Sequence, residues 1–354
     1  MKRIAYLFGT GITQSETNNA GYDIRVLTAQ IKDGIQIQLE KETAQIRDLI
    51  ANDLSTQGVD IEQLISLYES TGTSNDNEAA HFLRRAFVSE LVNRLDVVDK
   101  STERFQPVLI SALLELHKKY DKNLDERLLG IITLNYDDFA ERALDVVYSG
   151  FDYGFKMHDN ANQDVNSISK SDILLLKLHG SFNWGNEFPP VINATRNTDP
   201  EKCLWIPPGV EKKKEKYPFN ILWGKAKEIL DCDILRVIGC SLSRNDWQLI
   251  SLLHTAKRVR GLQIEFINYE DVAKDKDAEY PYLGIVTMLE IDGFRKYFST
   301  QTSIRESGKS IEDFSSSTNA TQFNCFREWL KFRKFTIESQ DNIDFESSVF
   351  IKQI

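Results

Sequence analysis

The chain has 354 residues, of which 41% are hydrophobic and 27% are charged. This length exceeds one typical globular domain, and the composition is that of a folded protein rather than a disordered one. The net charge of −10 argues against broad electrostatic binding to nucleic acid or to anionic lipid. The basic run Lys212–Lys216 is a local exception, and a solvated loop is its simpler interpretation.

The four cysteines suggest neither a metal site nor a disulfide framework. They are Cys203, Cys232, Cys240 and Cys325. No two of them form a Cys-x-x-Cys pair, and none has a histidine at zinc-ligand spacing, so a reducing compartment is the simpler interpretation. No stretch approaches the roughly 18 apolar residues of a membrane span, and the N-terminus lacks the apolar region of a signal peptide. We therefore expect a cytoplasmic protein with no metal and no membrane association.

The first predicted strand, Arg3–Phe8, is followed by a long interval with helical periodicity. Apolar residues recur there at helical spacing. The pattern predicts helices at Gln38–Asp53, Ile61–Glu69, Glu78–Leu95 and Arg104–Tyr120, with a polar loop at Thr71–Asn77. We interpret residues 31–126 as an all-helical insertion between the first and second strands.

Further short apolar runs continue the sheet after this insertion. They are Leu129–Leu134, Ile173–Leu178, Asp233–Ile238 and Gln263–Asn268, with another candidate at Ile285–Ile291. Each is compact and rich in β-formers, as in strands buried on both faces, and helical patterns such as Phe139–Val147 lie between several of them. The expected fold is α/β, a Rossmann-like parallel sheet with helices on both faces.

This organisation predicts three units. Residues 1–30 and 127–299 would form a nucleotide-binding domain, interrupted by the helical insertion. Residues 300–354 would form a C-terminal linker and a helical tail, with one helix at Gln322–Phe335. Within the nucleotide-binding domain, Glu187–Trp205 contains three prolines and is expected to be a long loop able to cover a site.

Glycine and polar residues follow five of the predicted strands where each one ends. The segments are Gly9–Thr13, Thr133–Asp137, Lys177–Ser181, Gly239–Ser243 and Ile267–Asn268. Each alone has a simpler explanation: Gly-x-Gly occurs in ordinary turns, Asn135 and Asp137 suit turns or helix caps, and a single His179 is usually structural. Because ligands bind at the carboxyl ends of parallel strands, the set together predicts a nucleotide site at one edge of the sheet.

In this order the segments resemble the sirtuin family. Sirtuins carry Gly-Ala-Gly-Ile-Ser, Thr-Gln-Asn-Ile-Asp, a His-Gly pair, a Gly-x-Ser loop and an Ile-Asn, and the chain carries similar residues at the five strand ends. The resemblance covers the sheet domain and leaves the helical block and the tail unmatched. It implies that the chain binds NAD and breaks the bond between nicotinamide and ribose.

The resemblance also implies roles for individual residues. The NAD-binding set would be Gly9, Thr10, Gly11 and Ser241 at the phosphates and Asn268 on the adenosine side, together with Thr13 and Gly239, and with Asp23 and Arg25 by a fainter similarity. Asp137 would bond the nicotinamide carboxamide, Asn135 would position the ribose or an attacking water, and His179 would act as the base. Nicotinamide leaves as a neutral ring, so this chemistry requires no metal.

Two departures from deacylating sirtuins distinguish between possible functions. The paired cysteines of their zinc module are absent from the sequence, and a large helical insertion is present. Both features resemble divergent sirtuin-like proteins of prokaryotic antiviral defence, which deplete NAD. Some of those proteins form large homo-oligomers and act with partners such as hexameric ATPases, which implies a homo-oligomer and a possible partner here. The resemblance therefore implies an NAD hydrolase that yields nicotinamide and ADP-ribose. The alternatives are an NAD-dependent protein deacylase and a non-catalytic nucleotide-binding assembly module.

The tripeptide Asn245-Asp246-Trp247 adds to this resemblance, because the sirtuin-like relatives often carry Asp-Trp after the fourth loop. We interpret it as the start of a helix that extends to Arg260, with Ser243 or Asn245 as its cap. Packing and capping are the roles expected of it from the sequence.

Overall fold

The structure is a computed structural model that describes most of the nucleotide-binding region and the helical block. The described residues are 1–17, 44–54, 61–100, 105–159, 171–193, 195–206, 215–240, 242, 246–269, 295–300, 303–306, 309–310, 326 and 329–330.

The main sheet contains eight strands in the order β11-β10-β9-β8-β7-β1-β2-β3. Their bounds are β1 Lys2–Phe8, β2 Glu126–Thr133, β3 Leu174–Lys177, β7 Ile234–Ile238, β8 Gln263–Tyr269, β9 Arg295–Thr300, β10 Ser303–Glu306 and β11 Lys309–Ser310. The six strands β9, β8, β7, β1, β2 and β3 pair in parallel. Strand β10 pairs antiparallel with both β9 and β11. Strands β2 and β3 are added on one side of β1, and β7, β8 and β9 are added on its other side. The strand order therefore reverses between β1 and β7.

The predicted α/β fold is confirmed. The five predicted strands correspond to β1, β2, β3, β7 and β8, and β2 begins three residues earlier than expected, at Glu126. The candidate strand Ile285–Ile291 lies outside the described residues. Strands β9 to β11 were not anticipated, and two of them lie in the segment that was expected to be a linker.

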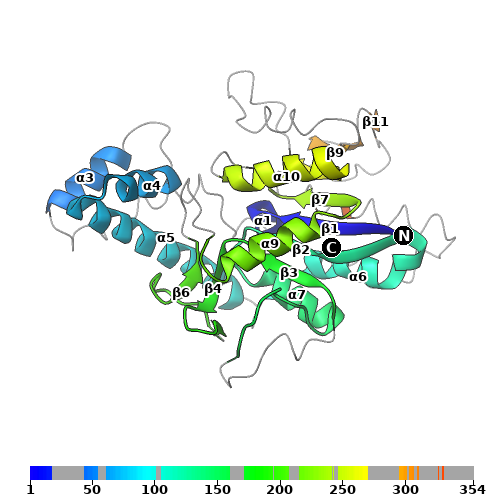
Figure 1. Cartoon of the computed structure of the whole chain (residues 1–354), viewed down its shortest axis with the longest axis horizontal. Coiled ribbons are helices and arrows are strands. Elements are labelled where there is room, and N and C mark those ends of the chain that lie inside the picture. Colours follow the sequence, from blue (N-terminus) through cyan, green and yellow to red (C-terminus); the bar gives the residue numbers. More distant parts are fainter. Residues whose placement is uncertain are drawn as a thin grey trace.

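Helices cover both faces of the sheet (Figure 1). Their bounds are α1 Thr10–Glu16, α6 Val108–Leu124, α7 Phe139–Tyr148, α9 Phe219–Ile229 and α10 Trp247–Arg260. Right-handed crossovers place α6 and α7 on one face and α9 and α10 on the other. Helix α6 begins at Val108 rather than at the predicted Arg104, because Pro107 is tolerated only at the start of a helix. Since α6 packs on α7 and β2, it joins the sheet although the predicted insertion, 31–126, includes it.

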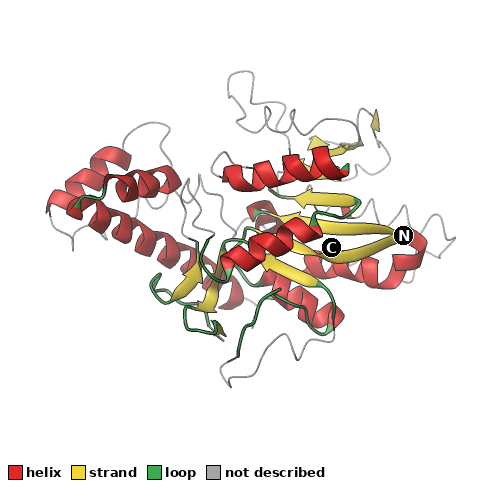
Figure 2. Cartoon of the chain, in the orientation of Figure 1, coloured by secondary structure: helices red, strands yellow, loops and turns green. Residues whose placement is uncertain are grey.

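The remaining helices form a separate block beside the sheet, on neither of its faces (Figure 2). Helices α3 Ala44–Leu54, α4 Ile61–Thr71 and α5 Ser74–Lys100 enclose their own apolar core. The predicted loop Thr71–Asn77 is wrong, since only Gly72 and Thr73 separate α4 from α5. Thr73 Oγ1 accepts from Asp76 N at 3.2 Å, as the side chain of an N-cap residue does, and donates to Asp76 Oδ2 at 2.6 Å.

A small sheet lies between the helical block and the main sheet. It pairs β4 Gly180–Gly185 with β5 Val191–Ile192 and β6 Cys203–Trp205. The predicted loop Glu187–Trp205 therefore contains two strands. They were missed because runs of two or three residues among prolines carry no periodicity.

The C-terminal region contributes to the main core. Phe326, Trp329 and Leu330 are helical and buried in the cluster that contains the main sheet. The predicted helix at Gln322–Phe335 is described only at these residues. None of the helices that the structure describes is long and apolar enough to cross a membrane.

Candidate functional site

The loops after β1 and β7 are in close contact at the point where the strand order reverses. Gly9 N donates to Ile238 O at 3.0 Å, and Gly11 N donates to Gly239 O at 2.8 Å. A Cβ on Gly9 would lie 2.6 Å from both Cys240 Cα and Gly239 O, so the loops can meet only without a side chain there. The glycines thus have a packing role, and their N–H groups are occupied by carbonyl oxygens.

Three of the predicted site residues form one hydrogen-bonded set beside this junction. Thr13 Oγ1 on α1 donates to Asp137 Oδ2 at 2.6 Å and accepts from Asn135 Nδ2 at 3.0 Å. Asn135 Nδ2 also donates to Gly9 O at 3.0 Å. The sequence places Thr13 far from the other two, and the parallel pairing of β1 with β2 brings them together.

One atom of this set lacks a partner. Asn135 is 3% exposed, and its Oδ1 is buried without a hydrogen bond to any described residue. A buried acceptor left unpaired costs about 1–3 kcal/mol, so a ligand or water that donates to it would be stabilised there. The fixed amide therefore presents an acceptor beside the junction of the two loops.

Tyr136 connects this loop to the helical block. Its ring stacks on Phe182 of β4 with centroids 4.8 Å apart, lies edge-on to Phe87 of α5 at 6.1 Å, and belongs to the core of the helical block. Its hydroxyl donates to Ile206 O at 2.9 Å. The backbone between Asn135 and Asp137 is thus anchored from the opposite side.

His179 follows β3 at the same edge of the sheet. Its ring centroid lies 6.2 Å from that of Tyr136, and its carbonyl accepts from Ile206 N at 2.9 Å. Gly180 has a φ of +78° and approaches the Leu204 backbone so closely that a Cβ would lie 2.3 Å from the carbonyl oxygen. The His-Gly pair therefore fits a turn that packs directly on β6.

A buried lysine lies behind Asp137. Lys177 is 0% exposed, and its ammonium donates to Asp137 O and to Glu141 Oε1, the latter at 2.8 Å. Burial raises the pKa of Glu141 to about 7, although the Lys177 ammonium opposes the shift. Lys177 therefore links the backbone of the site loop to helix α7.

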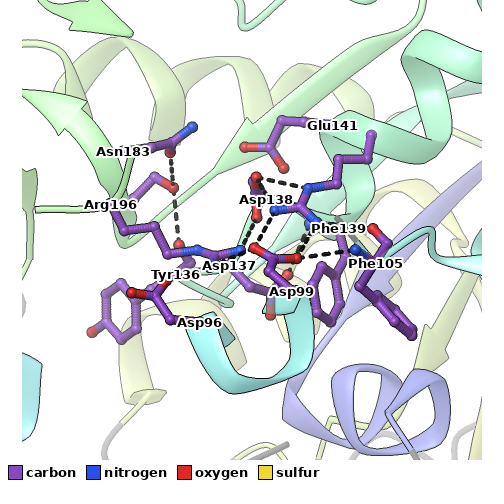
Figure 3. A network of polar contacts seen from close by, with 12 residues as sticks. Asp96, Asp99, Phe105, Tyr136, Asp137, Asp138, Phe139, Glu141, Asn183 and Arg196 are labelled. Atoms are coloured by element: carbon purple, nitrogen blue, oxygen red, sulfur yellow. Dashed lines mark hydrogen bonds and ion pairs between the residues drawn. The ribbon is translucent and has the colours of Figure 1, made fainter. Parts of the chain in front are cut away.

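A network of charged side chains adjoins this loop on its other side (Figure 3). Arg142 binds Asp99 and Asp138, with Nη1–Oδ1 at 2.6 Å and Nε–Oδ2 at 2.9 Å. Arg196, which precedes β6, binds Asp138 at 2.7 Å, Asp99 at 2.9 Å and Asp96 at 3.1 Å. Burial alone would raise the pKa of Asp138, but the two guanidinium groups outweigh it and lower the pKa. The network joins α5, α7 and the segment before β6 at the residue next to Asp137.

The remaining predicted residues are only partly described. Asp23, Arg25 and Ser241 lie outside the described residues, and Asn268 is placed only by its backbone, in β8 beside β9. Thr10 begins α1, directly after Gly9. Burial raises the pKa of Cys240 to about 12, so this thiol beside Gly239 is not a thiolate nucleophile. Among the described residues, no group of three or more His, Cys, Asp or Glu could hold a metal ion.

Several residues around the site were not identified from the sequence. Glu141 and Arg196 carry no local motif, because their contacts depend on the tertiary arrangement, and Lys177 was given no role although it begins the segment Lys177–Ser181. Lys177 gave the clearest available signal: it is a charged residue at the end of an apolar strand, which is unusual unless the charge is paired.

A comparison with protein-family models finds a match to the SIR2-like domain at residues 129–283. The matched region extends from within β2 past β8, and it contains Asn135, Asp137 and His179. The chain therefore contains a SIR2-like domain, as the sequence resemblance implied. A search of curated proteins finds no match.

Proposed function

We propose that this chain, through its SIR2-like domain, hydrolyses NAD to nicotinamide and ADP-ribose. SIR2-like domains use NAD, and the polar edge between β1, β2 and β3 is where such a ligand would bind. The observation that carries the proposal is the set formed by Thr13, Asn135 and Asp137, with the unpaired Asn135 Oδ1 at its centre.

The residues suit the chemistry of this cleavage. The nicotinamide of NAD is a cation that leaves as a neutral ring, so the bond breaks without protonation of the leaving group. Asn135 can accept from a ribose hydroxyl or from a water without carrying charge itself, and Asp137 is held by Thr13 in a fixed orientation. His179 can take the proton that the attacking water releases, an assistance of about 10²–10⁴-fold in rate.

The test is NAD consumption by the purified chain with no peptide present, followed by chromatography of nicotinamide and ADP-ribose. We expect turnover in the wild type, and its loss in Asn135→Ala and His179→Ala. Asn220→Ala and His254→Ala serve as matched controls, since Asn220 is exposed and His254 half-buried, both on outer helices. Turnover that persists in both folded site variants would contradict the proposal, and turnover that requires an acylated peptide would indicate a deacylase.

We further propose that the hydrolase is an NAD-depleting effector of antiviral defence, restrained until an infection signal or a partner acts. The support is the resemblance of the Thr-x-Asn-Tyr-Asp and Lys-Leu-His-Gly-Ser segments to such proteins. In cells that express the chain, NAD should fall after phage infection and should remain constant with His179→Ala. The mass of the particle in solution tests the implied homo-oligomer, and affinity capture tests a partner such as a hexameric ATPase.

A further inference from the structure

We propose that Asp246 orients His179 and stabilises its protonated form, so that the two side chains act as a positioning carboxylate and a base. The inference rests on the proposed function for its chemistry, whereas the pairing itself concerns only the side chains of this chain. It assigns a role to the Asp-Trp segment that differs from the capping expected from the sequence.

The first observation is the distance between the two groups. His179 Nε2 lies 3.6 Å from Asp246 Oδ1, and the two side chains are 7% and 14% exposed. This separation is longer than a hydrogen bond but within the range of an ion pair, and catalytic contacts often shorten when substrate binds. Because both groups are largely removed from water, the attraction between a carboxylate and an imidazolium is weakly screened.

The second observation concerns the helix that Asp246 begins. Asp246 is the N-cap of α10, a place where aspartate usually accepts a backbone N–H of the first turn. Here its side chain makes no capping hydrogen bond. Ser243 and Asn245, the caps expected from the sequence, lie outside the described residues, and the carboxylate of Asp246 lies close to His179.

Other titratable groups lie around the pair. The ring of His179 faces the Asp246 carboxylate from α10 and the phenol of Tyr136 from the loop after β2, and Asp246 also faces the thiol of Cys240, which it helps to keep protonated. The Tyr136 hydroxyl is occupied by its donation to Ile206 O. The Lys177 ammonium is bound by Glu141 and by the Asp137 carbonyl.

The pairing defines the path of the proton. With Nε2–H directed at Asp246, Nδ1 is the nitrogen that accepts a proton. As the water oxygen bonds to the ribose carbon, the water proton passes to Nδ1, the bond to nicotinamide breaks and its electron pair leaves with the neutral ring. Asp246 then faces an imidazolium, which returns to neutral by releasing the proton to solvent.

The test compares Asp246→Asn with Asp231→Asn in the full chain. Asp231 is exposed and lies before β7, at the opposite edge of the sheet, so its variant removes the same charge away from the site. The His179 imidazole is titrated by NMR and assigned through the signal lost in His179→Gln. We expect Asp246→Asn to lower the His179 pKa by about 1 unit or more, and Asp231→Asn to leave it unchanged.

Kinetics provide the second readout. Asp246→Asn should lower kcat for NAD by about tenfold to 10²-fold with little change in KM, and move the acid limb of the pH profile downward. Asp246→Glu keeps the charge, so the His179 pKa and kcat should lie closer to their wild-type values than in Asp246→Asn. The same two measurements can be made on this variant if Asp246→Asn does not fold. A purely structural Asp246 would leave the pKa and the pH profile in place.

The outcomes separate this inference from the proposed function. An unchanged His179 pKa in folded Asp246→Asn overturns the pairing, even if the wild type hydrolyses NAD. A lowered pKa in a chain that never consumes NAD supports the pairing and contradicts the hydrolase.

Discussion

In the part of the chain that the structure describes, two buried ion networks of arginines and carboxylates lie in different places. In the interior of the sheet, Arg236 on β7 binds Glu126 on β2 at 2.6 Å and Glu265 on β8 at 2.7 Å. At the carboxyl edge, Arg142 and Arg196 bind Asp99 and Asp138. The interior network connects strands, whereas the edge network connects a helix of the sheet, the helical block and an irregular segment.

The two networks differ in how their charges are shared. Glu126 and Glu265 share one guanidinium, so its removal leaves two buried carboxylates without that partner. Asp99 and Asp138 each contact two guanidinium groups, so either arginine can be lost while the carboxylates keep the other. The interior network should therefore govern the stability of the fold, and the edge network should govern the position of the site loop.

The largest expected effect is that of Arg236→Met. Breaking a buried ion pair from one side typically costs about 3–5 kcal/mol, because the remaining charge is buried and uncompensated. Urea unfolding should show a loss of that size, or an unfolded chain. Arg3→Met is the control, since Arg3 is half-exposed and its ion pairs should contribute less than about 1 kcal/mol. Equal stability of the two variants would remove the distinction between interior and edge.

The next effect concerns pH and Glu141, which lies beside Asp138 at the edge. Its folded-state pKa of about 7 exceeds the ordinary value of 4.5, so the folded chain retains a proton that the unfolded chain releases. The free energy of unfolding should therefore fall as pH rises from about 4.5 to 7, by about 3 kcal/mol in total, and then level off. In Glu141→Gln this fall should disappear, because the amide does not titrate. Urea unfolding at a series of pH values measures the free energy of unfolding. A fall that persists in Glu141→Gln would contradict its assignment to the raised pKa of Glu141.

Arg196→Met should affect activity more than stability. Asp138 and Asp99 keep Arg142, and Asp96 is 44% exposed and can be solvated, so the fold should survive. Asp138 is then held from one side only, and a small displacement of the adjacent Asp137 would lower kcat for NAD by about tenfold to 10²-fold. Arg94→Met, which removes an arginine paired within α5, is the control. If Arg196→Met lost as much stability as Arg236→Met, the edge network would belong to the framework.

Much of the sheet could be predicted from the sequence, since strands buried on both faces form continuous apolar runs such as Leu129–Leu134. The position of the site at their carboxyl ends followed from the polar residues after each run. The tertiary contacts could not be predicted, because nothing local marks Arg196 as a partner of Asp138 or Asp246 as a neighbour of His179. Helix α1 was missed because it is short and follows glycines, and β5 and β6 because two or three residues carry no period.

The smallest expected effect tests whether the C-terminal region shields the Arg236 network from water. The Trp329 ring lies 5.8 Å from the Arg236 guanidinium carbon and is 1% exposed, so the C-terminal region covers the buried charge. Trp329→Phe keeps an aromatic ring but weakens the attraction to the cation and removes some contact, and we expect a loss of about 1–2 kcal/mol in urea unfolding. Trp247→Phe, at a ring that is 58% exposed, should change stability by less than about 0.5 kcal/mol. A loss of stability confined to Trp329→Phe would mean that the C-terminal region helps to stabilise the main sheet, as the N-terminal strand β1 does. No loss would mean that the strands alone protect Arg236 from water.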